Sequence, residues 1–222
     1  MGGGLIVLEG IEGVGKSTQL QHLKRWLEQS GMVTTVREPG GTSAGDVIRR
    51  LLLDPESQLD ERTEALLFMA SRAQVVAEVI RPALARGDFV LVDRFFLSTY
   101  AYQIAGRGLP EDEVRRANAL ATDGLVPNLT LLLEMSAGAA LERAARRSAQ
   151  DRIERSGDAF YERVSSAFRT FASSDWQQNH PEAGPVVLVD ASGDEHDVAR
   201  RIQDVLQQRW SQTEPSFAGS NS

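Results

Sequence analysis

The chain has 222 residues, of which 41% are apolar and 25% charged, with a net charge of −7 at neutral pH and no cysteine. This composition is typical of one globular domain, and the acidic balance argues against a general nucleic-acid binder, because binding a phosphate backbone requires clustered cations. Since the chain has no apolar run near the roughly 20 residues that span a bilayer, no signal-peptide pattern and no possible disulfide, we expect a cytoplasmic protein without membrane or nucleic-acid partners.

Strand and helix patterns alternate along most of the sequence. In chain order they predict a strand over 5–9, a helix over 18–29, a strand over 32–37, helices over 44–53 and 62–80, a strand over 89–92, helices over 98–105 and 111–121, strands over 129–133 and 186–189, and a helix over 197–210. Continuous apolar strands such as FVLV and LTLLL are typical of a parallel sheet with helices on both faces. We therefore expect a single α/β domain over 1–212 and a disordered polar tail over 213–222.

A glycine-rich loop follows the first strand directly. Gly10, Gly15, Lys16 and Ser17 satisfy the pattern G-x-x-x-x-G-K-[ST] between a predicted strand and a predicted helix. Backbone N–H groups in such a loop form a nest for anions, and the start of the helix adds positive potential. Lys16 would reach the β- and γ-phosphates, and the hydroxyl of Ser17 would bind Mg²⁺. The alternative, a glycine-rich turn that binds nothing, is disfavoured by this context, so we predict a nucleoside triphosphate site.

The third predicted strand ends in a second candidate pair, Asp93 and Arg94. Ligands of open α/β sheets bind beyond the carboxyl ends of the strands, where both side chains would lie. Asp93 could hold Mg²⁺ through water, and Arg94 could bind a phosphoryl group. The alternative interpretation is a local salt bridge between Asp93 and Arg94. The phosphate loop elsewhere in the chain favours the functional interpretation. The N-K-x-D pattern of GTPases and the Asp-Glu strand end of many ATPases are both absent.

Longer motifs give the chain a resemblance to one family. GIEGVGKST (10–18), REPGGT (37–42), LLFMASRAQ (66–74), DRFFLSTYAYQ (93–103) and DRIE (151–154) resemble, in order and spacing, the motifs of the thymidylate kinase family. The resemblance covers residues 5 to about 210. It implies a three-layer P-loop nucleoside monophosphate kinase fold with about five parallel strands and a short arginine-rich lid at about 142–157. It also implies transfer of the γ-phosphoryl group of MgATP to dTMP, giving dTDP and ADP for dTTP synthesis, by a homodimer.

The resemblance also implies a role for individual residues. ATP would be bound by the phosphate loop and the residues after it, Gly10, Ile11, Glu12, Gly13, Val14, Gly15, Lys16, Ser17 and Thr18. The acceptor nucleotide would be bound by Glu12, Pro39, Arg49, Phe68, Arg72, Arg94, Ser98, Tyr102 and Gln103. Within this set Phe68 would stack on thymine and Arg72 would donate to a thymine carbonyl. Tyr102 would disfavour a ribose 2′-hydroxyl, Glu12 would reach a sugar hydroxyl, and Arg49 would hold the acceptor phosphate.

The lid is expected to supply the remaining cations. Because positions 11–14 of the phosphate loop contain no arginine, the resemblance implies that Arg147 and Arg152 close on the transferring phosphates, with Arg143 a weaker candidate. A solvated helix face is the alternative for this arginine-rich segment. Together with Lys16, Arg94 and Mg²⁺, these arginines would supply the charge for catalysis without a strong general base. A kinase for another acceptor and a nucleotide-dependent switch remain alternative functions.

Overall fold

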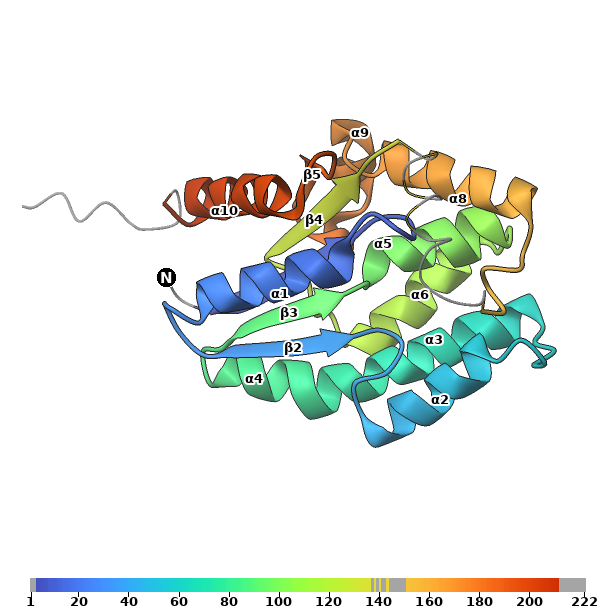
Figure 1. Cartoon of the computed structure of the whole chain (residues 1–222). Coiled ribbons are helices and arrows are strands. Elements are labelled where there is room, and N and C mark those ends of the chain that lie inside the picture. The colour runs from blue at the N-terminus through green and yellow to red at the C-terminus, as the bar shows by residue number, and fades with distance from the viewer. Residues whose placement is uncertain (1–2, 137, 139, 141–142, 144–150, 212–222) are drawn as a thin grey trace, which may run out of the picture.

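The computed structural model describes residues 3–136, 138, 140, 143 and 151–211 (Figure 1). Its five strands form one parallel sheet, as predicted, in the order β2-β3-β1-β4-β5. The strands are β1 (Gly4–Glu9), β2 (Val33–Arg37), β3 (Phe89–Asp93), β4 (Leu129–Glu134) and β5 (Val186–Asp190). The chain leaves β1 toward β2 and leaves β3 in the opposite direction toward β4. A crevice therefore lies between the carboxyl ends of β1 and β3.

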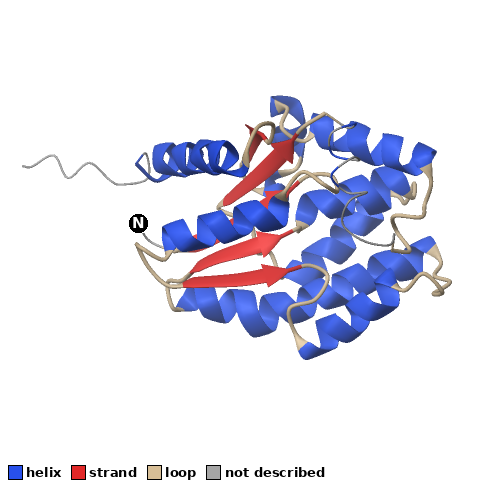
Figure 2. Ribbon diagram, in the orientation of Figure 1, coloured by secondary structure: helices blue, strands red, loops and turns tan. Residues whose placement is uncertain are grey.

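The alternating side chains of the strands divide between two cores, one on each face of the sheet. Ile6 and Leu8 pack with α1 (Lys16–Leu27) and α10 (Glu195–Ser211) on one face. Leu5 and Val7 pack on the other face, against the helices that follow β2 and β3 and those near β5 (Figures 1 and 2). Because both faces are covered, the strands have the continuous apolar sequences from which the sheet was predicted.

The helices on the second face match the predicted positions but include two π-helical turns. They are α2 (Ser43–Leu53), α3 (Glu61–Val75), α4 (Arg81–Ala85), α5 (Phe96–Thr99) and α6 (Glu111–Thr122). The turn η1 (Val76–Ile80) joins α3 to α4, in which Pro82 has no N–H to donate to the preceding turn. The turn η2 (Tyr100–Gly106) completes the helix predicted over 98–105 and carries two predicted site residues.

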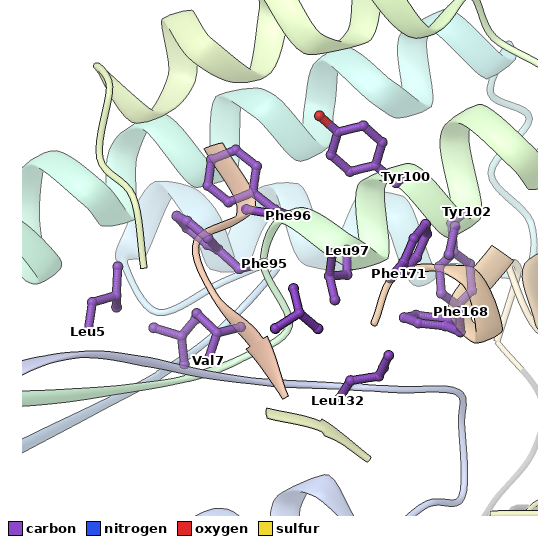
Figure 3. Packing of buried hydrophobic residues seen from close by; sticks show 14 of the residues in the cluster. Leu5, Val7, Phe95, Phe96, Leu97, Tyr100, Tyr102, Leu132, Phe168 and Phe171 are labelled. Carbon is purple, nitrogen blue, oxygen red and sulfur yellow. The ribbon is translucent and has the colours of Figure 1, made fainter. Parts of the chain in front are cut away.

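Further helices lie in the described residues 151–185, a part of the chain where the sequence patterns predicted only the end of the lid. These are α8 (Asp158–Thr170), α9 (Ser174–Asn179) and the 3₁₀ turn η3 (Pro181–Ala183). Phe160, Val164 and Phe168 repeat every four residues on α8, a helical signal that the sequence analysis did not use, and all three are buried. They pack on η2, where the rings of Tyr102 and Phe168 lie 6.3 Å apart (Figure 3). None of the helices in the described ranges has the length and apolar character needed to cross a membrane.

Candidate active site

The phosphate loop lies at the crevice between β1 and β3. Gly10 has a φ of 135°, and a Cβ there would come within 2.4 Å of the carbonyl oxygen of Leu133, so only glycine fits. Lys16 begins α1, and its Nζ donates to the carbonyl oxygens of Gly10 and Ile11 at 2.9 Å each. Burial, with the nearby charge of Arg94, lowers the pKa of Lys16 to about 8. The loop therefore presents a buried amine whose charged form a bound anion would stabilise.

Oxygen ligands for a divalent cation lie beside Lys16. The hydroxyl of Ser17 donates to Oδ2 of Asp93 at 3.1 Å, across the gap between α1 and β3. The second carboxylate oxygen of Asp93 is buried and has no hydrogen-bond partner among the described residues. A hydroxyl and a carboxylate are hard oxygen donors of the kind that Mg²⁺ takes, usually with several retained waters. The residues present therefore fit a Mg²⁺ ion delivered with a nucleotide.

Arg94 points back across the phosphate loop because its backbone adopts a left-handed conformation, with a φ of 70°. One terminal nitrogen donates to the carbonyl oxygen of Gly10 at 3.2 Å and to the hydroxyl of Ser98 at 3.0 Å. The other pairs with Oε2 of Glu12 at 2.7 Å, and the guanidinium lies 5.3 Å from the ring centre of Tyr102. Arg94 thus touches the loop of the donor site and the η2 turn at the same time.

A buried glutamate at the end of β1 holds this arrangement. Oε1 of Glu9 accepts from the backbone N–H groups of Phe95 and Ser98 at 2.7 and 3.0 Å, and Oε2 accepts from the hydroxyl of Ser98 at 2.7 Å. The carboxylate therefore ties the turn after β3 onto β1 and offsets part of the backbone strain at Arg94. No role was predicted for Glu9, although a charged residue at the end of a buried strand, just before the loop, is a usable signal in the sequence.

One cleft of about 220 Å³ gathers most of the predicted site residues. Those that line it are Glu12, Gly13, Gly15, Lys16, Ser17, Pro39, Arg49, Phe68, Arg72, Asp93, Arg94, Ser98, Tyr102 and Gln103. It is also lined by residues for which no role was predicted, namely Arg37, Glu38, Leu53, Thr99, Asp151, Ile153, Glu154 and Tyr161. Gly10, Ile11, Val14, Thr18 and Arg152 do not line it. Among the lining residues without a predicted role, Tyr161 lies on the unpredicted helix α8, and no motif in the sequence pointed to it.

Arg72 is 2% exposed, although it was predicted to face a base. Its Nε donates to Oε2 of Glu38 at 2.7 Å, and its terminal nitrogens donate to Thr99 at 2.9 Å, Asn118 at 2.6 Å and the carbonyl oxygen of Phe95 at 2.9 Å. Four of its five N–H groups are thus engaged within the described part of the chain. Arg72 also lines the cleft, and these four contacts leave one of its N–H groups available.

The partner of Arg72 is itself unusual. Burial raises the pKa of Glu38 to about 7 even though Arg72 opposes the shift, and Oε1 of Glu38 is buried without a partner among the described residues.

Arg49 lies next to this pair. It donates to the carbonyl oxygen of Pro39, the residue after Glu38, at 2.9 Å. Burial and the charge of Arg37 lower the pKa of Arg49. Two arginines close together at the rim of a cleft suit an anionic group.

Arg152 lies elsewhere than the resemblance implied. Its Nε donates to the carbonyl oxygen of Leu52 at 2.8 Å, and a terminal nitrogen pairs with Oε2 of Glu64 at 2.7 Å. Glu64 also accepts from Gln103 and Arg107. The described contacts of the Arg152 guanidinium are therefore with the α2–α3 region and not with the phosphate loop.

The other lid arginines are only partly described. Arg143 donates to the carbonyl oxygen of Gly193 at 3.3 Å, in the loop that follows β5. Arg147 lies outside the described residues. The described contacts therefore place neither Arg143 nor Arg152 beside Lys16.

Comparison with known proteins identifies one family. The family model described as thymidylate kinase matches residues 8–207. A thymidylate kinase of a Cyanothece species is 44% identical over 239 residues, covering 98% of this chain and 99% of its own. That of Deinococcus radiodurans is 43% identical over 205 residues, covering 92% and 96%. The crystal structure of a thymidylate kinase from Ehrlichia chaffeensis superposes with a TM-score of 0.71 at 29% identity, covering 92% of this chain and 99% of that one.

Proposed function

This chain belongs to the thymidylate kinase family, and we propose that it transfers the γ-phosphoryl group of MgATP to dTMP, giving dTDP and ADP for dTTP synthesis. The observation that carries the proposal is that Lys16, Arg94 and Phe68 line one cleft. Groups suited to a donor phosphate and groups suited to a base therefore lie within the reach of two nucleotides placed end to end. Phosphoryl transfer needs chiefly such alignment and charge neutralisation.

On the donor side, the phosphate loop and the start of α1 bind the triphosphate. The ammonium of Lys16 exchanges its two carbonyl partners for β- and γ-phosphate oxygens. Mg²⁺ that arrives with ATP would be held by the hydroxyl of Ser17 and, through water, by Asp93, and it would neutralise charge on the β- and γ-phosphates. Residues 10–18 provide backbone N–H groups for the same oxygens.

On the acceptor side, three groups orient dTMP. Arg49 binds the acceptor phosphate, Phe68 stacks on the base, and the remaining N–H of Arg72 donates to a base carbonyl. Tyr102 stands against the guanidinium of Arg94, where its ring limits room at the 2′ position. Pro39, Ser98, Gln103 and Glu12 complete the acceptor pocket.

Arg94 joins the two halves. It touches Gly10 in the donor loop and Ser98 in the acceptor pocket, so its guanidinium can bind oxygens of both the acceptor phosphate and the γ-phosphate. The attacking phosphate oxygen of dTMP is already ionised, so no side chain needs to act as a strong base. We propose that Arg147 supplies the lid cation. Arg152 could do so only by leaving Glu64, and Arg143 is engaged near β5.

A panel of acceptors tests this function. ADP formation from MgATP is measured by a coupled assay with dTMP, dUMP, dCMP, dAMP and thymidine in turn. The proposal predicts turnover with dTMP well above that with dCMP, dAMP or thymidine. Turnover only with thymidine would identify a nucleoside kinase, and ADP release that ignores every acceptor would indicate a nucleotide-dependent switch.

The unusual pKa of Lys16 gives a prediction on ATP binding. Phosphate oxygens favour the charged amine, so ATP binding at pH 8.5 should take up about three quarters of a proton, the fraction that a lysine with a pKa of about 8 lacks there. ATP affinity should correspondingly fall as the pH rises through about 8. Titration calorimetry in two buffers of different ionisation enthalpy measures the uptake. At pH 7 it should be near zero, and equal uptake at both pH values would contradict the assignment.

We also propose that the protein is a cytoplasmic homodimer that associates through helices beside the sheet. Val47 and Leu51, four residues apart on α2, are 56% and 44% exposed, and Leu66 on the neighbouring α3 is 61% exposed. Large apolar side chains exposed together often mark an interface. Leu66→Asp should therefore shift the sedimentation coefficient toward the monomer. Met32→Asp, at a residue 74% exposed that lies before β2, should leave it unchanged. A monomeric wild-type protein would refute this proposal.

A further inference from the structure

Glu64 connects the acceptor pocket to two arginines and is itself almost inaccessible. Its side chain is 1% exposed on α3. Oε2 pairs with Arg107 at 2.9 Å and with Arg152 at 2.7 Å, while Oε1 accepts from Nε2 of Gln103 at 3.0 Å and from Nε of Arg107 at 3.1 Å. These partners come from η2, from the residue after it and from the end of the lid. No role was predicted for Glu64 from the sequence.

The ionisation of Glu64 determines how the amide of Gln103 must lie. Burial favours the neutral acid, but hydrogen bonds and charge from Arg107, with further hydrogen bonds from Gln103 and Arg152, lower the pKa of Glu64 below its usual value. An ionised carboxylate only accepts hydrogen bonds, so it must face the amide nitrogen of Gln103 and not the amide oxygen. The oxygen of Gln103 is then directed away from Glu64, on a side chain that lines the cleft.

This orientation gives the cleft a defined hydrogen-bonding pattern. Arg72 can only donate, and the amide oxygen of Gln103, on the side of the amide away from Glu64, can only accept. Thymine offers a carbonyl acceptor at position 4 next to a donor at N3, which complements that pair. Cytosine offers the reverse, an amino donor next to an acceptor at N3, and would leave both protein groups unpaired.

We propose that Glu64 is a positioning residue for base selection, which makes the pocket reject cytosine nucleotides by fixing the amide of Gln103 with its oxygen toward the base. The inference rests on the proposed function and adds to it a residue that never touches the substrate. A buried amide without such a partner could rotate by 180° and pair with either base. The fixed orientation of the Gln103 amide therefore leaves dTMP binding unaffected but weakens dCMP binding.

The test compares kcat/KM for dTMP and dCMP in wild type and in Glu64→Gln. A glutamine at position 64 can present either a donor or an acceptor to Gln103, so the preference for dTMP should fall roughly ten- to a hundredfold. The change should appear mainly in the KM for the two acceptors, with the KM for ATP within about threefold of wild type. A folded Glu64→Gln protein that keeps the wild-type preference would overturn the proposal.

Two further variants separate positioning from general loss of structure. Arg107→Lys removes the guanidinium that pairs with Glu64 and lies 4.4 Å from the ring centre of Phe160, but it keeps a positive charge beside the carboxylate, so Glu64 stays ionised and the preference should persist. In a Gln103→Ala background, Glu64→Gln should cause no further loss of preference, because the group it orients is gone.

The outcomes are decisive even where a variant is unstable. If Glu64→Gln does not fold, Gln103→Ala alone must lose the preference, and an unchanged preference there refutes the proposal. If wild type turns over dTMP but not dCMP, and the variants keep that preference, the role of Glu64 is refuted and the kinase function stands. Wild type that turns over neither nucleotide would refute the proposed function and this inference with it.

Discussion

Replacing Arg94 with alanine should lower kcat for dTMP phosphorylation by roughly 10³-fold or more, the range found for arginines that bind a transferring phosphoryl group. The guanidinium of Arg94 contacts the donor loop at Gly10 and the acceptor pocket at Ser98, so its loss removes charge from both sides of the transferring phosphoryl group. Arg94→Lys keeps the charge but not the planar fork, and it should recover only part of the rate. Steady-state kinetics with dTMP and ATP varied separately measure both effects.

The matched control for this prediction is Arg81→Ala. Arg81 also donates to backbone carbonyls, those of Thr122 and Asp123, but it lies at the start of α4 and does not line the cleft. Its kcat should equal that of wild type. An Arg94→Ala enzyme with kcat within tenfold of wild type would remove Arg94 from the catalytic machinery.

The second large effect is expected at Arg147. If the lid supplies the cation that neutralises the equatorial oxygens, Arg147→Ala should lower kcat by about 10³-fold while the affinity for dTMP, measured by calorimetry without ATP, changes little. Charge that matters only in the transition state affects kcat and not ground-state binding. An unchanged kcat would show that Arg147 has no part in the reaction.

Arg152→Ala provides the comparison that the structure suggests. Because Arg152 is held by Glu64 and by the carbonyl oxygen of Leu52, its loss should lower thermal stability and affect kcat less than the loss of Arg147. A drop in kcat for Arg152→Ala as large as that expected for Arg147→Ala would mean that Arg152 leaves Glu64 and closes on the transferring phosphates, the role that the family resemblance implied for it.

The strands and the phosphate loop could be predicted because their signals are local. A buried parallel strand needs a continuous apolar run, and an anion nest needs glycine at fixed spacing, so both leave a mark in the sequence. The same holds for Asp93 and Arg94, which follow a strand whose carboxyl end must face the crevice. The helix α8 also had a usable signal in the spacing of Phe160, Val164 and Phe168, which the prediction missed beside a segment interpreted as a lid.

The buried carboxylates could not be predicted in the same way. Glu64 receives Gln103 from 39 positions away and Arg152 from 88 positions away, and these contacts exist only after folding. Glu38 and Arg72 likewise stand 34 positions apart, although each lies in a motif that the resemblance used. The resemblance could name Arg72 as a base-reading residue, but it could not show that four of its N–H groups are used inside the protein.

Transfer of a labelled γ-phosphoryl group tests the central claim most directly. The enzyme is incubated with Mg²⁺, dTMP and ATP that carries the label on its γ-phosphate, and the products are separated. If two nucleotides meet end to end over the crevice between β1 and β3, the label will appear in dTDP at a rate equal to ADP formation. Label released as inorganic phosphate at that same rate, with no labelled dTDP, would contradict the account.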